Sequence, residues 1–393
     1  MTIDYRAEAE ALRQQLINWR RDFHQHPELA FEEYRTAGIV AEELNRLGLE
    51  VQTGVGQTGV VGLLEGAHDG PTVLVRADMD ALPILEENDF PFKSTVAGKM
   101  HACGHDGHTA IALGVVNILS RHRDQISGRI KFVFQPAEEV VGGAKAMIKD
   151  GVLENPRPDV SVGLHLWNGM PLGQLGVADG PVMAGSSSFT LRVTGKGGHG
   201  ASPQDAVDPV VCAAHIITAL QSIVSRSVAP LESAVISVTR MQAGTAFNII
   251  PQEALLYGTI RTFKREVRDM VERRMHEVAE GICLAMGCSA QLEIEHHVLP
   301  VANDRQVSER LRSVFAQMVG EGGLDTNERT MGSEDVGLFM DDIPGMYFFV
   351  GAAAKNQDAY YGHHHPRFDF DEEALPLSAA LLSAAVAQYV IPE

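Results

Sequence analysis

The sequence is 393 residues long, and this length exceeds what one hydrophobic core usually organises, so two domains are expected. Its formal net charge at pH 7 is −19, with 32 Lys and Arg against 51 Asp and Glu. Nucleic acids and anionic membranes bind clustered Lys and Arg, so this balance argues against both as partners.

The distribution of apolar residues and cysteines predicts a soluble protein of a reducing compartment. The first residues are polar and lack the apolar core of a signal peptide. The longest apolar run, over residues 110–119, is about half the length of a membrane span. The four cysteines show no paired spacing, so we expect a cytoplasmic location, with thiols free or bound to metal.

Short apolar runs alternate with amphipathic stretches in the first part of the chain. Helices are expected over 6–23, 36–47 and 109–120, and buried strands over 72–77, 128–135 and 159–166. This alternation predicts an α/β domain with a mostly parallel sheet and helices on both faces. A strand over 344–352 and a helix over 375–390 continue the same pattern near the end of the chain.

The pattern changes after residue 184. The expected elements are strands over 189–196, 233–244, 254–263 and 291–298, and helices over 208–226 and 264–286. Their order is β-α-β-β-α-β, that of a ferredoxin-like unit. We therefore expect a small domain, 185–297, inserted into a larger α/β domain made of 1–184 and 298–393.

Metal-seeking side chains follow the first three buried strands. In open α/β sheets, ligands bind outside the carboxyl ends of the strands. The first strand leads to Asp78 and Asp80, the second leads to Glu138 and Glu139, and the third stops at His165. We therefore expect these side chains to gather at one edge of the sheet.

Two further clusters carry residues of the same kind. Cys103 and His105 stand in a Cys-Gly-His loop before a helix, and His363, His364 and His365 precede a proline late in the chain. A thiolate is a soft ligand able to bridge two divalent ions, and imidazole nitrogens complete such sites.

A pair of bound metal ions suits hydrolysis. Together they lower the pKa of a water molecule and polarise a carbonyl oxygen. A carboxylate that does not bind metal must then take the proton of that water and pass it to the leaving group. Glu138 and Glu139 are neighbours after a strand, so their side chains leave in different directions and can divide these two tasks.

Each of these features also has an ordinary structural interpretation. Glu138 and Glu139 alone would be a solvated turn, and His165 alone would be a hydrogen-bonded structural residue. The three consecutive histidines would be a surface loop, and Cys103 would pack as a small apolar side chain. Their joint placement at strand ends favours a metal site over these separate explanations.

The chain carries a series of motifs in a familiar order. They are RADMDALPI, HACGHDGH, FQPAEE, GLHLW, GKGGHGASP, FNIIP, GTIRTF, MGSED and HHPRFDFDEE. This series resembles the aminoacylase, hippurate hydrolase and indole-acetyl-amino-acid hydrolase group of dinuclear metallopeptidases. That group is related to carboxypeptidase and succinyl-diaminopimelate desuccinylase. The resemblance covers nearly the whole chain.

The resemblance implies a particular division of the metal ligands. Cys103 matches the bridging ligand, one ion is also held by matches to His105 and His165, and the other by matches to Glu139 and His364. The ions are expected to be Zn²⁺ or Mn²⁺, with Co²⁺ and Ni²⁺ as alternatives.

Further roles follow from the same resemblance. Glu138 matches the catalytic base, and Asp80 matches a carboxylate that orients a ligand or the base. The place of Asp78 is taken by a histidine ligand in more distant relatives, and His105 is the extra ligand of the aminoacylase-like branch.

The inserted domain resembles the lid and dimerisation domain of that group. His199 matches a residue that reaches the partner subunit's site and stabilises the oxyanion, and Asn248 and Arg261 match substrate-binding positions. Arg261 would suit a substrate carboxylate through its planar guanidinium group. A homodimer or a higher homo-oligomer is therefore expected. His24 and His26 are assigned a structural role.

The expected activity is hydrolysis of the amide bond of N-acyl amino acids, such as N-acetyl or N-benzoyl conjugates. A dipeptidase or carboxypeptidase using the same dinuclear site is the alternative, distinguished by a free α-amino group on its substrate. The third possibility is an inert metal-binding or ligand-binding relative, which the presence of Glu138 disfavours.

Overall fold

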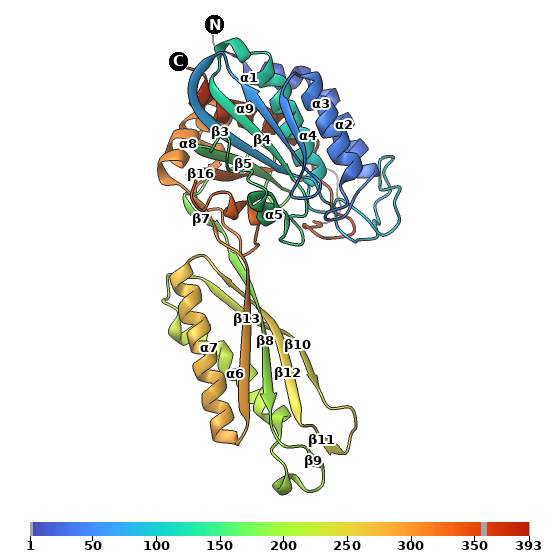
Figure 1. The fold of residues 1–393 in the computed structure, drawn as a ribbon, viewed down its shortest axis with the longest axis vertical. Coiled ribbons are helices and arrows are strands. Elements are labelled where there is room, and N and C mark those ends of the chain that lie inside the picture. Colours follow the sequence, from blue (N-terminus) through green and yellow to red (C-terminus); the bar gives the residue numbers. More distant parts are fainter. Residues whose placement is uncertain (1–2, 355–359, 393) are drawn as a thin grey trace. The chain divides into compact units, whose positions relative to one another are not determined.

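The computed structural model describes residues 3–354 and 360–392 and divides the chain into two compact units (Figure 1). The first unit comprises Met1–Val182, Val301–Arg329 and Asp335–Glu393. The second comprises Met183–Pro300 and Thr330–Glu334. The predicted inserted segment 185–297 lies within the second unit.

The first unit is built on an eight-stranded sheet with the order β1-β2-β4-β3-β5-β16-β6-β15. Its strands are β1 (Glu50–Val55), β2 (Gly59–Glu65), β3 (His68–Asp78), β4 (Ser127–Gln135), β5 (Val160–Trp167), β6 (Leu175–Gly176), β15 (Leu324–Asp325) and β16 (Gly345–Gly351). The central neighbours β4, β3, β5 and β16 are parallel, whereas β1 and β2 form an antiparallel hairpin. The carboxyl ends of β3, β4 and β5 therefore share one edge.

Helices cover the two faces of this sheet unequally. The helices are α1 (Tyr5–Ala11), α2 (Arg13–Gln25), α3 (Tyr34–Arg46), α4 (His105–Ser120), α5 (Gly143–Lys149), α8 (Arg305–Val319) and α9 (Ala374–Val390). Val73, Val75 and Ala77 of β3 pack in one core cluster with α4 and α9. The alternate residue Arg76 faces the other side, where it reaches Asp335 near the short helix α5. The predicted α/β architecture is confirmed.

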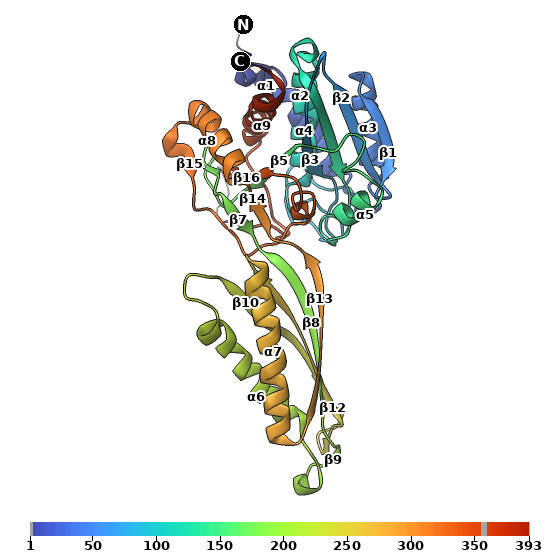
Figure 2. The same cartoon turned by 60° about the vertical axis from the view of Figure 1, so that its left-hand side comes forward.

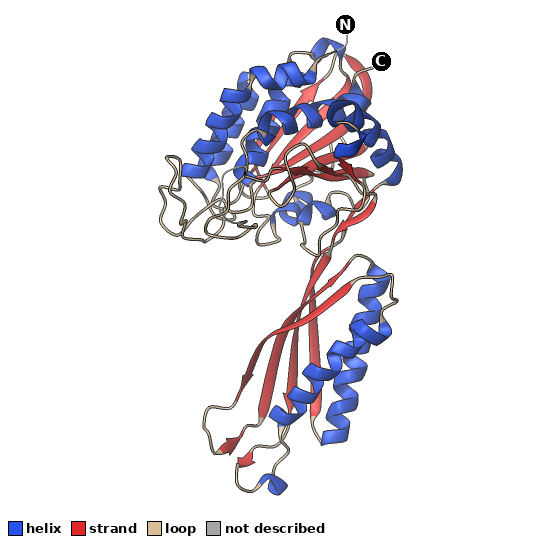
Figure 3. Ribbon diagram, turned by 180° about the vertical axis from the view of Figure 1, so that it is seen from behind, coloured by secondary structure: helices blue, strands red, loops and turns tan. Residues whose placement is uncertain are grey.

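The second unit has a four-stranded antiparallel sheet with the order β10-β12-β8-β13. Its elements are β8 (Gly185–Thr194), α6 (Pro209–Ser222), β10 (Ala234–Ala243), β12 (Glu253–Thr262), α7 (Arg265–Met286) and β13 (Ser289–Val298). Figures 2 and 3 show α6 and α7 along one face of this sheet. The element order is the expected β-α-β-β-α-β. The remaining strands of the described residues form two short pairs. These are β9 (Gly198–His199) with β11 (Ile249–Ile250), and β7 (Gly180–Met183) with β14 (Val301–Asn303).

Several details differ from the expected elements, which did not include α5 and α8. The single helix expected over 6–23 is divided at Leu12, whose N–H donates to the carbonyl of Ala9 at 3.1 Å in a tight i to i−3 turn. β5 does not stop at His165 but continues to Trp167, because β16 pairs with it as far as Gly351. The hairpin of β1 and β2 was not among the predicted elements.

One helical segment passes a length and composition test for membrane spans. It covers Pro209–Ser227, with a mean hydropathy of 1.3 and 28% of the tested window buried. Core helices of soluble proteins pass the same test. Here Cys212, Ile216 and Leu220 from this segment pack in the core of the second unit. This finding is weak evidence for a membrane span.

Candidate metal centre

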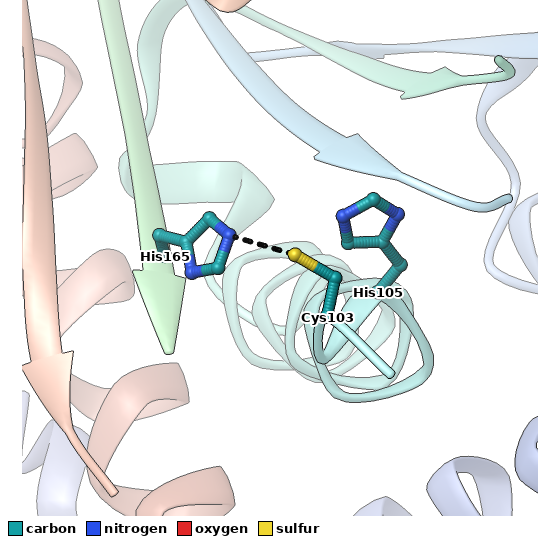
Figure 4. A group of neighbouring side chains, drawn as sticks. All are labelled: Cys103, His105 and His165. Carbon is teal, nitrogen blue, oxygen red and sulfur yellow. Dashed lines mark hydrogen bonds between the residues drawn. The ribbon is translucent and has the colours of Figure 1, made fainter. Parts of the chain in front are cut away.

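The centre is built around the start of α4, which lies at the carboxyl edge of the sheet. Gly104 precedes the helix with a φ of +96°, a left-handed conformation that glycine adopts without strain. Figure 4 shows Cys103 pointing toward His165 of β5, with the ring of His105 on the other side of Cys103. The sequence Cys-Gly-His therefore supplies two candidate metal ligands from one loop.

The His105 imidazole is oriented by the loop after β3. Its Nδ1 lies 2.9 Å from the carbonyl oxygen of Asp80 and 3.3 Å from Oδ1 of the same residue. Its Nε2 is buried and has no hydrogen-bond partner among the described residues. A buried ring nitrogen left free in this way is suited to bind a metal ion.

His165 presents its Nε2 to the thiol of Cys103. The two atoms are 3.6 Å apart, and Nδ1 of His165 donates to the carbonyl of Leu166 at 2.7 Å. Because Nδ1 holds the proton, the lone pair of Nε2 points into the centre (Figure 4). Burial lowers the pKa of His165 well below its usual value, so the ring is neutral, as a metal ligand must be.

Two groups of ligand atoms share one cysteine. The ligand atoms of Cys103, His105 and His165 all lie within 4.8 Å of one another, and so do those of Cys103, Glu139 and His364. The structure thus brings together all five predicted metal ligands, in the two sets that the family resemblance implies. A shared thiolate between two such sets fits a pair of divalent ions.

Asp80 anchors the turn that carries both glutamates. Its Oδ1 accepts the N–H of Glu138 and its Oδ2 accepts the N–H of Glu139, each at 3.0 Å. One oxygen of Glu138 lies 3.9 Å from Nε2 of His105, while Oε2 of Glu139 lies 3.3 Å from Nε2 of His364. Oε1 of Glu139 also lies 3.9 Å from Nε2 of His105, so both carboxylates border His105, and Glu139 also faces His364.

The three late histidines have different partners. His364, with a left-handed φ of +66°, faces Glu139 and Cys103. Nε2 of His363 donates to the carbonyl of Leu166 at 3.1 Å, and Nδ1 of His365 accepts the N–H of Arg367 at 3.0 Å. Only His364 of the three has its ring nitrogen in a ligand group among the described residues.

The electrostatics of the centre favour cations. Burial alone would lower the pKa of His105, but Asp78, Asp80 and Cys103 together outweigh it, so the pKa is well above the usual value. Hydrogen bonds with Cys103 and Glu139 raise the pKa of His364 to about 10. The raised pKa values of His105 and His364 mean that both rings hold protons beside anionic side chains. This indicates an anionic pocket that divalent ions would neutralise.

The described residues fit a pair of divalent ions. The donor set combines a thiolate, three imidazoles and a carboxylate, and Oε1 of Glu139 is buried without a hydrogen-bond partner in the described chain, like Nε2 of His105. Unsatisfied buried donors and acceptors are costly, and metal coordination would satisfy both atoms.

Three predicted site residues lie in the second unit. His199 ends β9 and is exposed. Asn248 directly precedes β11, and its carbonyl accepts the N–H of Gly200 at 2.8 Å, so the two predicted residues lie at the same end of the β9–β11 pair. Arg261 is half-buried on β12 and donates a hydrogen bond to Ser333. Their roles in substrate binding and oxyanion stabilisation stay predictions.

His24, His26 and the cysteines of the second unit lie outside the candidate metal groups. His24 lies between Asp106 and Glu86, at 2.8 and 3.1 Å, and His26 contacts the carbonyl of Asp22 at 2.9 Å. Neither belongs to a candidate metal group of the described residues. The four cysteines are free, and the buried sulfurs of Cys212 and Cys283 lie 3.6 Å apart between α6 and α7.

Sequence reasoning missed a layer of polar residues beneath the ligands. Arg76 is buried and donates to Asp78 at 2.7 Å and to Asp335 at 3.2 Å. His108 lies 2.6 Å from the other oxygen of Asp78. Two signals were present: a charged residue inside an apolar strand, and the spacing of His105 and His108, which places both on one helix face.

The fold and the paired ligand groups define a metal-dependent amidohydrolase of α/β architecture. Residues 74–388 match Peptidase family M20/M25/M40, and the chain belongs to this family, whose members hydrolyse C–N bonds of amides and peptides.

Relatives within the family carry several activities in their names. N-acetylcysteine deacetylase of Bacillus subtilis is 39% identical over 373 residues, covering 94% of this chain and 95% of the deacetylase. Thermostable carboxypeptidase 2 of Saccharolobus solfataricus is 39% identical over 368 residues, covering 93% and 92%. IAA-amino acid hydrolase ILR1-like 4 of Arabidopsis thaliana is 38% identical over 380 residues, covering 96% and 86%.

A solved structure extends the comparison to the metal centre. The YXEP protein of Bacillus subtilis, described as a dinuclear metal-binding peptidase of the M20 family, matches with a TM-score of 0.85 and 35% identity. The match covers 96% of this chain and 98% of the YXEP chain. The family and the ligand groups together support a divalent metal pair in this protein.

Proposed function

We propose that the protein hydrolyses the amide bond of N-acyl amino acids, releasing a carboxylic acid and a free amino acid. The observation that carries this proposal is the pair of ligand groups sharing Cys103, with the carboxylate of Glu138 beside His105. Relatives named as an N-acetylcysteine deacetylase and an IAA-amino acid hydrolase support the substrate class.

The chain's own residues divide the work. Bound divalent ions would supply an acidic water molecule and polarise the substrate carbonyl. Cys103, His105 and His165 would hold one ion, and Cys103, Glu139 and His364 the other. Glu138 takes the proton from the attacking water and delivers it to the leaving nitrogen.

The turn that carries Glu138 is held rigidly for this task. Both backbone amides of the Glu138–Glu139 pair donate to Asp80, so the backbone that carries the base is fixed by two hydrogen bonds. Glu138 is 7% exposed, and this burial keeps bulk water from competing for the transferred proton.

Three residues of the second unit have proposed roles toward the substrate. Arg261 would bind the substrate carboxylate through its guanidinium group, Asn248 would contact the substrate, and His199 would stabilise the oxyanion in the partner subunit. These roles are supported by the family resemblance of their motifs. The role of His199 requires a homodimer or a higher homo-oligomer.

A dimer is supported by the surface of the second unit. Phe247 is fully exposed and Ile249 is 57% exposed on the segment that follows β10, the edge strand of the sheet. Exposed apolar side chains favour association with another chain. Light scattering on the purified protein measures the assembly directly, and a monomer at micromolar concentration would contradict the dimer.

A substrate panel tests the activity. The protein is loaded with Zn²⁺ or Mn²⁺, and with Co²⁺ or Ni²⁺ for comparison, and amino acid release is measured from N-acetyl and N-benzoyl amino acids. Metal-stripped protein is the control. Turnover no higher than that of the stripped protein on every substrate would refute the proposal.

The second candidate is a carboxypeptidase or dipeptidase, favoured by the relative named thermostable carboxypeptidase 2. Free dipeptides and N-blocked peptides join the same panel. A kcat/KM for free dipeptides above that for N-acyl amino acids would select this candidate. We also propose a cytoplasmic location, which the low cysteine content supports and cell fractionation would test.

A further inference from the structure

His108 joins the ends of two neighbouring strands. It stands in the first turn of α4 and is 3% exposed. Its Nδ1 lies 2.6 Å from Oδ1 of Asp78, the last residue of β3, and its Nε2 lies 2.9 Å from the backbone nitrogen of Leu166 in β5. One imidazole therefore spans the carboxyl edge between β3 and β5.

The partners determine which nitrogen carries the proton. The backbone N–H of Leu166 can only donate, so Nε2 of His108 accepts with its lone pair. Nδ1 then carries the hydrogen and donates it to the carboxylate of Asp78. Both nitrogens are engaged, so His108 has no lone pair left for a metal ion, unlike His105 and His165.

His108 links β3 and β5 where the hydrogen bonds between these two strands end, at the carboxyl edge of the sheet. β3 and β5 are paired from Val73 with Val160 to Arg76 with Gly163, and the amide of Leu166, three residues further along β5, bonds to His108 instead. Thr109, the next residue of α4, donates to the backbone carbonyl of Asp78 at 2.8 Å. Beyond the paired residues, hydrogen bonds to the first turn of α4 therefore replace the hydrogen bonds between β3 and β5.

Leu166 transmits the position of His108 to His165. The carbonyl of Leu166 accepts hydrogen bonds from Nδ1 of His165 at 2.7 Å and from Nε2 of His363 at 3.1 Å. His108 fixes the backbone of Leu166 by accepting its N–H. The carbonyl of Leu166 then orients the ring of His165, so that Nε2 of His165 faces Cys103. The other end of the connection reaches His105, whose Nε2 lies 3.6 Å from Oδ2 of Asp78.

The second ligand group is held by different contacts. The backbone N–H of His364 donates to the carbonyl of Ala102 at 2.7 Å, and that of Glu139 donates to Asp80 at 3.0 Å. His108 therefore contacts Asp78 and Leu166, which lie against His105 and His165, whereas the amides of Glu139 and His364 are bound by Asp80 and Ala102.

We propose that His108 is a positioning residue for one half of the metal centre, the group of Cys103, His105 and His165. The inference rests on the proposed function only in treating the two ligand groups as cation sites. Loss of His108 weakens binding of one ion and leaves the ion of Cys103, Glu139 and His364 in place.

Two conservative variants separate the two hydrogen bonds. In His108→Asn the amide nitrogen takes the place of Nδ1 and keeps the bond to Asp78, but the acceptor for Leu166 is lost. In His108→Gln the longer amide offers an oxygen near the place of Nε2 and restores that acceptor. A matched control is His122→Asn, since His122 lies beyond the other end of α4 and contacts Glu8 at 2.6 Å.

The experiment titrates full-length, metal-stripped protein with Co²⁺, and follows bound metal by elemental analysis and by the absorption of the thiolate-bound ion. Wild-type protein and His122→Asn are expected to bind two ions per chain. His108→Asn is expected to keep one at wild-type affinity and to bind the other roughly 10- to 100-fold more weakly. His108→Gln is expected to recover most of this affinity.

Two ions bound by His108→Asn with wild-type affinity would overturn the proposal, and so would equal weakening of both. Metal binding is measured without substrate, so an inactive substrate panel would refute the proposed function and leave this result standing. If His108→Asn does not fold, ¹⁵N spectra of the wild-type histidine rings decide. The Nδ1–H form of His108 is expected, and the Nε2–H form would overturn the proposal.

Discussion

Nε2 of His165 lies 3.6 Å from Sγ of Cys103, although the two residues are 62 positions apart in the chain. The distance is too long for a strong hydrogen bond and leaves room for an ion that both atoms would bind. Because Sγ of Cys103 is also grouped with Glu139 and His364, this cysteine is common to both halves of the centre.

Replacing the shared thiol should therefore empty the centre. In Cys103→Ala both ligand groups lose their common member, and we expect less than one divalent ion per chain by elemental analysis, with kcat falling to the level of metal-stripped protein. Cys288→Ala, a change in the second unit, is the control and should keep two ions. Two ions in Cys103→Ala would show that the thiolate is not the bridge.

Glu138 and Glu139 should respond differently to the same substitution. Glu138→Gln removes the proposed base but no member of the two shared-cysteine groups. We expect kcat to fall roughly 10²- to 10⁴-fold with metal content unchanged. Glu139→Gln should instead lose the ion of the His364 group. Metal loss in Glu138→Gln, or near-normal kcat, would reverse the two assignments.

Asp80→Asn tests the anchor of the glutamate turn. The substitution replaces one accepting oxygen by an amide NH₂, which faces the N–H of either Glu138 or Glu139. We expect activity to fall about 10- to 100-fold and the free energy of unfolding to fall by about 1–3 kcal/mol. Asp69→Asn, at the exposed amino end of β3, is the matched control. Equal kcat in the two variants would contradict the role of Asp80.

The strands that carry the ligands were predictable because their signals are local. Apolar runs such as those ending at Asp78 and Gln135 are buried strands in the structure, and the polar residues after them meet at one edge because the strands are parallel. The position of Cys103 before a helix was predictable from the glycine that follows it. These parts of the site depend on sequence neighbours alone.

Other features depend on contacts between distant segments. His364 is the one of three consecutive histidines that faces the centre, because its left-handed backbone and its bond to Ala102 turn it there. The role of His108 depends on the point where the pairing of β3 with β5 ends, which the pattern of apolar residues in the sequence does not predict. The end of β5 at Trp167 is likewise determined by pairing with β16.

The buried imidazole of His24 should make stability depend on pH. Its Nδ1 lies 2.8 Å from Asp106 and its Nε2 lies 3.1 Å from Glu86, and carboxylates only accept, so both nitrogens carry protons. Burial alone would lower the pKa of His24, but these hydrogen bonds outweigh it and the pKa is raised above 6.5. Glu86 shows the converse: burial would raise its pKa, but the interactions with His24, Ser94 and Asn88 together lower it from 4.5.

The sign of the effect follows from these directions. A raised histidine pKa contributes stability that is fully present below pH 6.5 and is lost as the pH rises through the folded-state value. The lowered pKa of Glu86 contributes stability above pH 4.5 that is lost in acid. We expect the free energy of unfolding of the wild-type protein, measured with urea, to decline above pH 6.5. That of His24→Gln should decline less, so the difference in unfolding free energy between the two proteins should become smaller as the pH rises. Parallel decline of the two proteins would show that His24 is not protonated in the folded state.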